Sequence, residues 1–271
     1  MKSGIYENSR DVFLDTVKVS DYIDIERLSN IFQSLKDSID KPFKMILLYG
    51  KPGTGKSMFL AKLHHSLQET HKIFLYKTPI LDESEFFKTL IQDLYDINYE
   101  TELNFTQFMK ALDSKEQSDT ATPIILLDEA QLYPPAMMEK IRLLSDTRRV
   151  KFIIALHKTE KEDLIVKEHF KSRIWESFKL ENAPASELKI YIQKKLMRAN
   201  CIDTADMFTR QSIKLIHKLT EGNYRNTNKL LYTLFEIYMF YEQNNPSKIK
   251  GSDISNTIIE MAAIHTGLIN A

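Results

Sequence analysis

The sequence predicts an α/β protein: a three-layer αβα core built on a parallel sheet, followed by a small all-helical domain. Three observations predict it. Short apolar runs alternate with amphipathic helical stretches as far as residue 182, which is typical of a parallel sheet covered on both faces. Beyond that point only helical spacing continues. The chain also has only seven glycines, and Gly50, Gly53 and Gly55 lie close together, which indicates a loop of special backbone conformation.

The core is predicted to begin with an amphipathic helix over Asp21–Ile39, whose apolar residues recur at helical spacing. Short continuous apolar runs are typical of strands buried on both faces. These runs predict the strands Met45–Tyr49, Lys72–Tyr76, Ile124–Leu127, Phe152–Leu156 and Trp175–Leu180. The stretches between them predict the helices Lys56–Leu67, Glu83–Tyr95, Asn104–Leu112, Pro135–Leu144 and a short helix over Asp163–Glu168.

The C-terminal part is predicted to be helical throughout. Apolar residues at helical spacing lie near Leu188–Leu196 and Ile213–Leu219, and then over Leu230–Tyr241 and Ile254–Met261. A linker is expected at Asn182-Ala183-Pro184. The sequence therefore predicts an N-terminal segment with the lead-in helix of the core over residues 1–40, the core over 41–182 and the helical domain over 183–271.

Composition excludes several classes of protein. Thirty-seven Lys and Arg residues balance thirty-seven Asp and Glu residues, so no global basic field attracts a nucleic acid. Binding of a nucleic acid would need a local basic patch. No apolar run approaches the roughly 18–20 residues of a membrane helix. The charged N-terminus does not fit a signal peptide, and the single Cys201 excludes an internal disulfide framework. We expect a cytoplasmic protein that does not insert into a membrane itself, although a partner could recruit it to the inner membrane face.

The glycine cluster forms a phosphate-binding motif. Gly50-Lys51-Pro52-Gly53-Thr54-Gly55-Lys56-Ser57 has the spacing G-x-x-x-x-G-K-S between a predicted strand and a predicted helix, which is the context of a P-loop. Its backbone N–H groups and the helix N-terminus attract phosphate oxygens. We expect these residues and the following Met58 to bind a nucleotide, with Lys56 at the β and γ phosphates and Ser57 as a ligand of Mg²⁺.

An acidic pair completes the predicted site. Asp128 and Glu129 directly follow the apolar run Ile124–Leu127, where a bare buried carboxylate is costly unless a cation compensates it. Asp128 is therefore expected to hold Mg²⁺. Glu129 is suited to orient the attacking water, so the pair predicts hydrolysis as well as binding.

These motifs, the order of strands and helices and the helical C-terminal part resemble AAA+ ATPases. In that family Walker A, Walker B and a helical lid enclose ATP at a subunit boundary. The resemblance implies ATP and Mg²⁺ as cofactors and a homo-oligomer. The residues themselves do not distinguish ATP from GTP.

Finer details are similar to the ExeA/GspA general secretion ATPases and their relatives MshM and TniB, over about residues 20–245. The matching segments are Asp128-Glu129-Ala130-Gln131, the stretch from Met138 to Ser145, the helix that follows Pro184 and the turn from Gly222 to Asn228. Two positions depart from the family pattern: Lys195 stands where Arg is usual, and Tyr224 stands in place of Pro.

The resemblance also implies roles for three further residues. Arg225 matches the sensor 2 arginine of the lid, which contacts the γ phosphate. Arg173 matches the arginine finger that a subunit presents to its neighbour's nucleotide, where it stabilises charge on the transferred phosphoryl group. His157 ends the fourth predicted strand at the sensor 1 position, where Asn or Thr is usual; a purely hydrogen-bonded His is the alternative.

The predicted function is a Mg²⁺-dependent ATPase that uses ATP to assemble or remodel a partner complex. Resemblance to ExeA, GspA and MshM implies a protein partner in a type II secretion, type IV pilus or DNA-uptake apparatus. One alternative is an ATP-dependent, DNA-acting switch of transposition or replication-initiator type, against which the neutral charge weighs. The other is a nucleotide-gated scaffold with negligible turnover.

Overall fold

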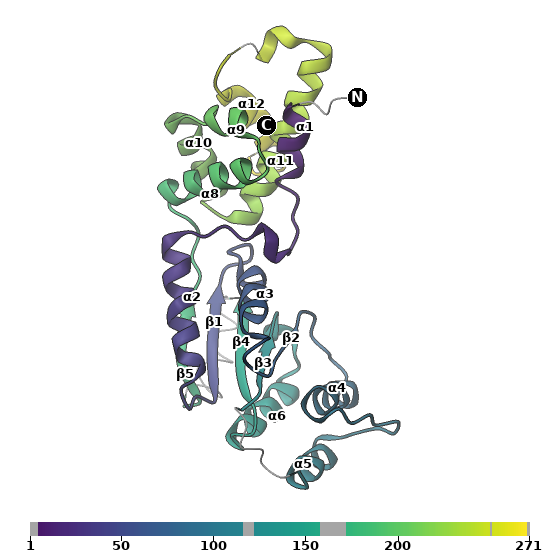
Figure 1. Cartoon of the computed structure of the whole chain (residues 1–271). Helices are drawn as coiled ribbons and strands as arrows, with labels where there is room; N and C mark the ends of the chain where they lie inside the picture. The colour runs from purple at the N-terminus through teal and green to yellow at the C-terminus, as the bar shows by residue number, and fades with distance from the viewer. Residues whose placement is uncertain (1–4, 116–121, 158–171, 250, 270–271) are drawn as a thin grey trace. The chain divides into compact units, whose positions relative to one another are not determined.

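The structure, a computed structural model, describes residues 5–115, 122–157, 172–249 and 251–269 (Figure 1). Its contacts divide the chain into two compact units. One unit, here the helical unit, contains Met1–Ser29, Gly53–Gly55 and Glu181–Ala271, and the other, the sheet unit, contains Asn30–Pro52 and Lys56–Leu180. These units are made of several chain segments, so they do not test the domain boundaries expected at residues 40 and 182, which stay a prediction.

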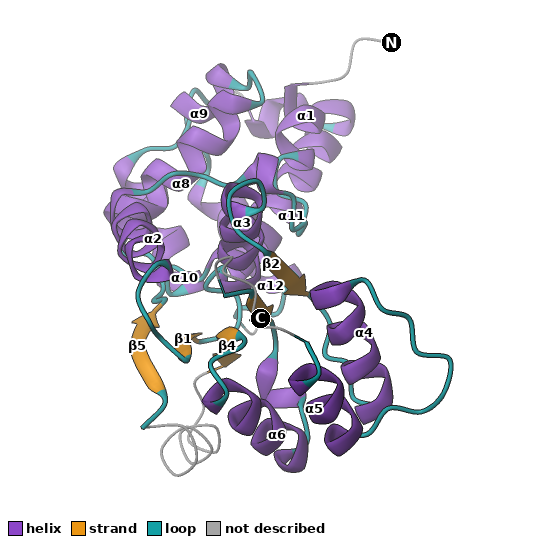
Figure 2. Cartoon of the chain, turned by 60° about the horizontal axis from the view of Figure 1, so that its bottom comes forward, coloured by secondary structure: helices purple, strands orange, loops and turns teal. Residues whose placement is uncertain are grey.

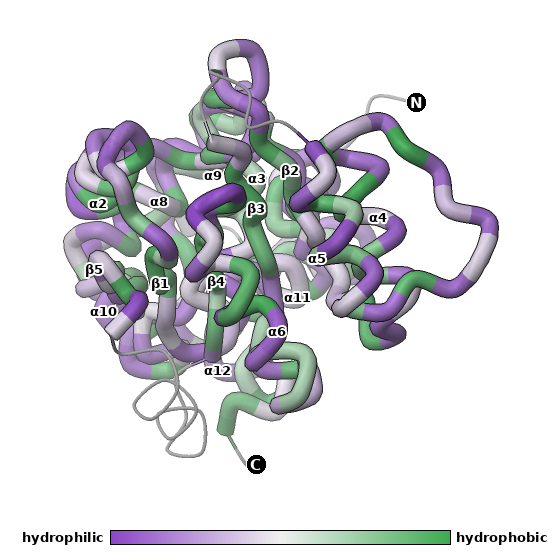
Figure 3. Tube along the Cα trace, turned by 90° about the horizontal axis from the view of Figure 1, so that it is seen from below, coloured by the Kyte–Doolittle hydropathy of each residue, from purple (hydrophilic) through white to green (hydrophobic). Residues whose placement is uncertain are grey.

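The sheet unit is built on five parallel strands in the order β2-β3-β4-β1-β5. The strands are β1 (Met45–Gly50), β2 (Ile73–Tyr76), β3 (Ile124–Leu127), β4 (Lys151–His157) and β5 (Ile174–Lys179). Every residue of β3 is buried, as are all but one of β1, whereas β5 at the edge alternates between half-buried and exposed residues. The strongly apolar β1, β3 and β4 stand out in Figure 3. The central strands are therefore more deeply buried than the edge strand β5.

Helices cover both faces of the sheet (Figure 2). On one face lie α2 (Glu26–Ile39) and α3 (Lys56–Leu67), whose Phe32 and Phe59 rings meet edge to face at 5.5 Å. On the other face lie α4 (Glu83–Tyr95), α5 (Phe105–Asp113) and α6 (Pro135–Asp146), whose apolar residues form one buried cluster with the inner residues of the strands. Side-chain caps start two of these helices: Asp82 accepts a hydrogen bond from the Glu85 amide, and Asn104 and Gln107 form a capping box.

The helical unit holds helices from both ends of the chain. Its C-terminal helices are α8 (Ala185–Arg198), α9 (Ile202–Asp206), α10 (Arg210–Thr220), α11 (Tyr224–Asn244) and α12 (Asn256–His265). The N-terminal helix α1 (Ile5–Asp11) packs on α11. Aromatic rings join them. The ring centres of Tyr6 and Tyr238 lie 4.9 Å apart, and those of Phe13, just after α1, and Phe235 lie 5.9 Å apart. Shorter 3₁₀ turns lie at Val19–Asp21 and Pro246–Ile249 in this unit and at Ala130–Leu132 in the sheet unit.

The predicted fold class is confirmed, including all five strands. The helix predicted over Asp163–Glu168 lies outside the described residues. The helix predicted over Asp21–Ile39 begins only at Glu26. Asp21 ends a 3₁₀ turn, and Tyr22 after it has extended backbone. The side chains of Arg198 and Lys194 bind the carbonyls of Tyr22 and Asp24 at 2.9 and 2.8 Å. These tertiary contacts use backbone carbonyls of the segment that was predicted to be helical.

Lys195 is a buried cation in the helical unit. Only 8% of the residue is exposed. Its ammonium lies 5.4 Å from the Phe13 ring centre, 5.5 Å from that of Tyr191 and 3.5 Å from the Asn228 Oδ1. Burial lowers the pKa of Lys195 to about 8, against the opposing effect of the Asp21 and Asp15 carboxylates. The helical unit therefore holds this ammonium at a cost in stability.

This cost predicts a dependence of stability on pH. The folded-state pKa of about 8 lies below the ordinary value of 10.5, so the unfolded chain binds more protons between these values and stability rises with pH there. Below pH 8 both states are protonated, and the penalty is about 3 kcal/mol at most. We expect Lys195→Met to raise the free energy of unfolding at pH 7 by up to about 3 kcal/mol. The rise in stability of the wild type between pH 8 and 10 should be absent from this variant. Urea unfolding of both proteins at pH 7 and 10 measures this; equal pH dependence in the two would contradict it.

Candidate functional site

Three strands that are neighbours in the sheet bring the predicted site residues of the sheet unit, except Arg173, to their C-terminal ends. Because β3, β4 and β1 are parallel and adjacent, their C-terminal ends meet there. β1 ends at Gly50, where the glycine-rich loop begins, and β3 ends just before Asp128. β4, between them, ends at His157, which pairs in register with Gly50. The fold thus brings together the loop, the acidic pair and His157, which are far apart in the sequence.

The loop between β1 and α3 has the backbone that its glycines allow. Gly53 and Gly55 have φ angles of 78° and 93°, in the left-handed region that side chains rarely adopt. α3 begins directly after the loop, at Lys56, so its first N–H groups point toward the loop. This is the arrangement in which a helix N-terminus attracts an anion.

Lys56 is buried in this loop, with 4% of the residue exposed. Its ammonium donates hydrogen bonds to the carbonyl oxygens of Gly50 at 2.9 Å and Lys51 at 3.1 Å. The loop therefore fixes a positive charge beside its own backbone N–H groups. Ser57 and Met58 follow in the first turn of α3 and are half-buried, whereas Lys51 and Pro52 are exposed.

The acidic pair divides into a buried and an accessible carboxylate. Asp128 is 5% exposed, and its Oδ1 accepts a hydrogen bond of 2.9 Å from the Glu129 amide. Glu129 has a φ of 49°, which turns the chain sharply at the end of β3, and its side chain is 31% exposed. Asp128 thus offers oxygen ligands from a fixed position, while Glu129 reaches solvent.

Gln131 and His157 hold the Glu129 carboxylate from two sides. His157 Nε2 lies 3.1 Å from Glu129 Oε1, and the Gln131 amide nitrogen donates to Glu129 Oε2. The same Gln131 nitrogen lies 3.3 Å from His157 Nδ1, and the Gln131 Oε1 accepts from the His157 backbone amide at 3.2 Å. A neutral imidazole protonated at Nε2 satisfies all four contacts, because Nδ1 then accepts from Gln131.

His157 is hydrogen-bonded in this structure, with its Nε2 directed at Glu129. Its sensor 1 role stays a prediction. Sequence reasoning did not select Gln131 as a site residue, although it belongs to the Asp-Glu-Ala-Gln segment that carries the resemblance. Its contact with His157 depends on β3 and β4 being neighbours, which the spacing of the motif does not reveal.

Arg173 lies at the N-terminal ends of the strands, whereas the loop lies at their C-terminal ends. It directly precedes β5, whose first residue, Ile174, pairs with Met45 at the start of β1. The Arg173 guanidinium contacts both carboxylate oxygens of Asp146, at 3.3 and 3.2 Å. The structure therefore does not bring Arg173 together with Lys56, Asp128 and Glu129 of the same chain.

Arg225 lies in the first turn of α11, in the helical unit. Its guanidinium pairs with Asp15 at 3.3 Å, and the side chain is 58% exposed. The turn before it needs glycine at position 222, where φ is 73° and a Cβ would lie 1.9 Å from the Ala183 carbonyl oxygen. The Asn223 side chain caps α11 by accepting from the Asn226 amide. The turn predicted from the sequence thus starts the helix that carries Arg225.

None of the helices described is long and apolar enough to span a bilayer. No group of three or more His, Cys, Asp or Glu side chains in the described part of the chain has the arrangement of a metal site.

Comparison with known proteins supports the fold. Residues 40–165 match the AAA domain family. The chain is similar in structure to Drosophila ORC bound to DNA, with a TM-score of 0.68 and 12% identity over 96% of this chain and 65% of the other. It is also similar to Cdc6p from Pyrobaculum aerophilum (TM-score 0.64, 13% identity, 94% and 70% covered) and to Thermotoga maritima RuvB (TM-score 0.57, 16% identity, 92% and 72% covered). No curated protein sequence matches the chain.

These similarities identify the architecture as the P-loop AAA+ fold with a helical C-terminal region. At 12–16% identity they extend to the fold and not to the activity of any one relative. The chain spans slightly under two thirds of the length of the Drosophila ORC chain.

Proposed function

We propose that this chain is a Mg²⁺-dependent ATPase that works as a homo-oligomer and uses ATP to assemble or remodel a partner complex. The observation that carries the proposal is the convergence of the glycine-rich loop, Asp128, Glu129 and His157 at one edge of the sheet. The match of residues 40–165 to the AAA domain family supports it.

The chemistry of the side chains fits a nucleotide with its metal ion. Lys56 would bind the β and γ phosphates from its fixed place in the loop. The Ser57 hydroxyl and the buried Asp128 carboxylate are hard oxygen ligands of the kind that Mg²⁺ prefers. When bound, the ion would neutralise charge that develops on the phosphate oxygens. Loop amides and the start of α3 would hold the phosphates in line for attack.

Glu129 would orient the attacking water and take up its proton. Its carboxylate reaches solvent and is held on both oxygens by His157 and Gln131, so its direction is restricted before substrate binds. In this proposal His157 acts on Glu129 rather than directly on the γ phosphate. A neutral imidazole fits this role, because its Nε2–H can donate a hydrogen bond to the Glu129 carboxylate.

The remaining two cations would complete the site on assembly. Arg225 would contact the γ phosphate from the helical lid. Arg173 would act on the nucleotide of a neighbouring subunit, since its own loop lies at the other edge of the sheet. An arginine that is supplied in trans stabilises charge in the transition state and makes turnover depend on the oligomer.

For the partner, we propose a secretion, pilus or DNA-uptake apparatus in the cytoplasm or at the inner membrane face, on the strength of the ExeA/GspA-like segments. A second candidate is a DNA-acting switch. It is favoured by the similarity to Drosophila ORC bound to DNA and to Aeropyrum pernix ORC1 in complex with DNA, at 12% and 15% identity. The zero net charge weighs against it unless oligomers form a basic channel. Negligible hydrolysis by the oligomer would instead identify a nucleotide-gated scaffold.

A trapped complex tests these candidates. We expect Glu129→Gln to bind Mg-ATP without hydrolysing it, because the amide does not accept the proton of water, and therefore to retain partners that leave after turnover. The variant is recovered from cells with and without nuclease, and the co-purifying proteins are identified. Lys56→Ala, which should not load nucleotide, is the matched control.

The two outcomes are distinct. Apparatus components that survive nuclease, and that are missing from the Lys56→Ala control, would support the first candidate. A nuclease-sensitive complex with DNA and a recombinase or replication factor would support the second. Wild-type turnover by Glu129→Gln would contradict the role given to Glu129.

A further inference from the structure

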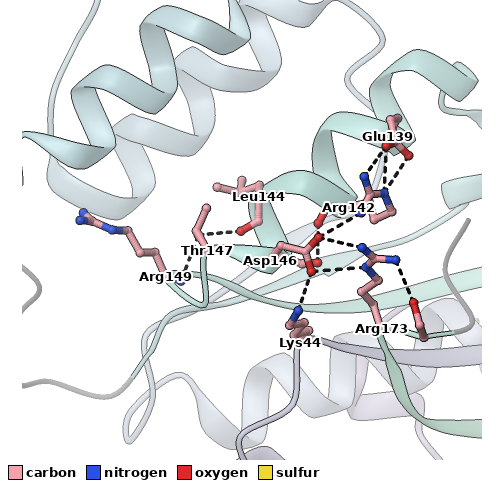
Figure 4. Close-up of polar contacts among 10 residues, drawn as sticks. Lys44, Glu139, Arg142, Leu144, Asp146, Thr147, Arg149 and Arg173 are labelled. Carbon is pink, nitrogen blue, oxygen red and sulfur yellow. Dashed lines mark hydrogen bonds and ion pairs between the residues drawn. The ribbon is translucent and has the colours of Figure 1, made fainter.

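A charged cluster lies at the edge of the sheet opposite the glycine-rich loop, centred on Asp146 (Figure 4). Asp146 is the last residue of α6, Lys44 directly precedes β1, and Arg173 directly precedes β5. The Lys44 ammonium lies 2.6 Å from Asp146 Oδ1, and Arg142 Nη1 lies 3.0 Å from Oδ2. One carboxylate thus ties the starts of two strands to the end of a helix.

The cluster carries an excess of positive charge. Lys44, Arg142 and Arg173 surround Asp146, and Glu139 adds a second carboxylate on Arg142, which leaves three cations against two anions. Burial raises the pKa of the Asp146 carboxyl, but hydrogen bonds from Lys44 and Arg173 outweigh this effect and lower it. Asp146 is therefore ionised at neutral pH, and these five side chains together carry a net charge of +1.

Asp146 uses one edge of the Arg173 guanidinium. Nε and Nη2 of Arg173 point to the two carboxylate oxygens, at 3.3 and 3.2 Å, and Nη1 donates to Ser172 Oγ at 2.8 Å. A guanidinium has five N–H donors in a rigid plane. Among contacts with described residues, three are used and one N–H on each of Nη1 and Nη2 remains. The Arg173 side chain is 31% exposed, so these donors can meet an anion from outside the chain.

The chain's own nucleotide is out of reach of this arginine. β1 separates Lys44, beside the cluster, from Gly50, at the start of the loop. Six residues of strand span about 20 Å, which exceeds the length of an arginine side chain. A nucleotide that meets Arg173 must therefore be bound by another molecule, and a second copy of this chain would supply one of complementary charge.

We propose that Asp146 is a positioning residue: it holds the inner edge of Arg173 so that the outer edge faces the phosphates bound by the next subunit. This inference rests on the proposed function and goes beyond it, because it assigns a residue of α6 to a site in another subunit. A planar donor that is fixed on one edge loses little freedom when it binds on the other. Displacement of the donor by about 1 Å lowers the rate on the order of 100-fold.

Asp146→Asn tests the proposal. We expect kcat for ATP hydrolysis to fall about 100-fold, with KM for ATP nearly unchanged, because the variant's own binding loop is intact. Ion pairs at this exposure add little to stability, so the variant should fold. Asp146→Asn with Lys44→Met is a second variant that restores the original charge balance but still lacks the carboxylate, and it should show the same loss.

Mixing of subunits separates positioning in trans from a structural role. Glu129→Gln subunits bind ATP without hydrolysing it and carry an intact Arg173. Mixed oligomers of Glu129→Gln and Asp146→Asn subunits should regain a large part of the wild-type turnover. In them, the nucleotide sites of Asp146→Asn subunits receive the well-held Arg173 of Glu129→Gln subunits. Glu139→Gln is the matched control: it removes a carboxylate from the cluster, leaves the Asp146–Arg173 contact and should keep wild-type turnover.

The outcomes distinguish this inference from the proposed function. Absence of ATP hydrolysis by the wild-type oligomer would contradict the proposed function itself. If Arg173→Ala loses turnover but Asp146→Asn does not, the inference alone is wrong. If mixing restores nothing to Asp146→Asn, or if neither Asp146 variant folds, Asp146 is a structural residue and the inference is overturned.

Discussion

Lys56→Ala is expected to weaken nucleotide binding strongly and to remove hydrolysis. The ammonium of Lys56 is the buried cation of the glycine-rich loop, held by the carbonyls of Gly50 and Lys51. A hydrogen bond to a charged group is worth up to about 3 kcal/mol, so the loss of the phosphate contact should weaken ATP binding roughly 100-fold. The transition state carries more charge than the ground state, and turnover should fall below detection.

Binding of a fluorescent ATP analogue and release of phosphate measure the two effects. Lys62→Ala is the matched control, because Lys62 lies on the same helix and its ammonium packs over the Phe32 ring instead. It should bind and hydrolyse ATP as the wild type does. Hydrolysis at the wild-type rate by Lys56→Ala would show that the site has been assigned to the wrong loop.

Arg173→Ala is expected to stop turnover while ATP affinity stays nearly the same. The guanidinium lies at the sheet edge away from its own loop, so its removal leaves the subunit's binding site complete. An arginine supplied in trans accelerates phosphoryl transfer by about 10³–10⁵, and a loss of this size is expected in kcat. The rate should also depend on protein concentration in the wild type, because the site is completed only on assembly.

Arg149→Ala provides the control for this prediction. Arg149 follows α6 closely, but its guanidinium binds the backbone carbonyls of Leu112 and Lys115 rather than Asp146. Its removal should leave kcat at the wild-type level. A loss of ATP affinity in Arg173→Ala, with kcat spared, would instead identify Arg173 as a structural residue of its own subunit.

The sequence predicted those parts of the molecule that depend on local pattern. Buried strands such as Ile124–Leu127 are continuous apolar runs, and the motif from Gly50 to Ser57 carries its own backbone requirement in its glycines. The acidic pair could be placed because it follows a buried strand directly. These features depend on short-range spacing, which a single sequence displays.

The features that were missed depend on the register of distant segments. Gln131 and His157 meet because β3 and β4 are adjacent. Arg173 meets Asp146 where β5 pairs with the start of β1. The short helix α1 has seven residues, too few to be stable alone in water. It forms by packing on α11, a contact between opposite ends of the chain that no local pattern encodes.

The position of β5 has a consequence for how the molecule could respond to load. The glycine-rich loop, the acidic pair and His157 extend from strands at the middle of the sheet, whereas Arg173 leads into an edge strand with alternating exposed residues. Strands at the margin open at a lower free energy than the core does. In the proposed function, the phosphates would therefore bind at strands from the buried middle of the sheet, and Arg173 would reach the neighbouring subunit from beside the more exposed strand β5. A pull from that neighbour would then act first on β5 and only afterwards on the strands that carry the nucleotide site.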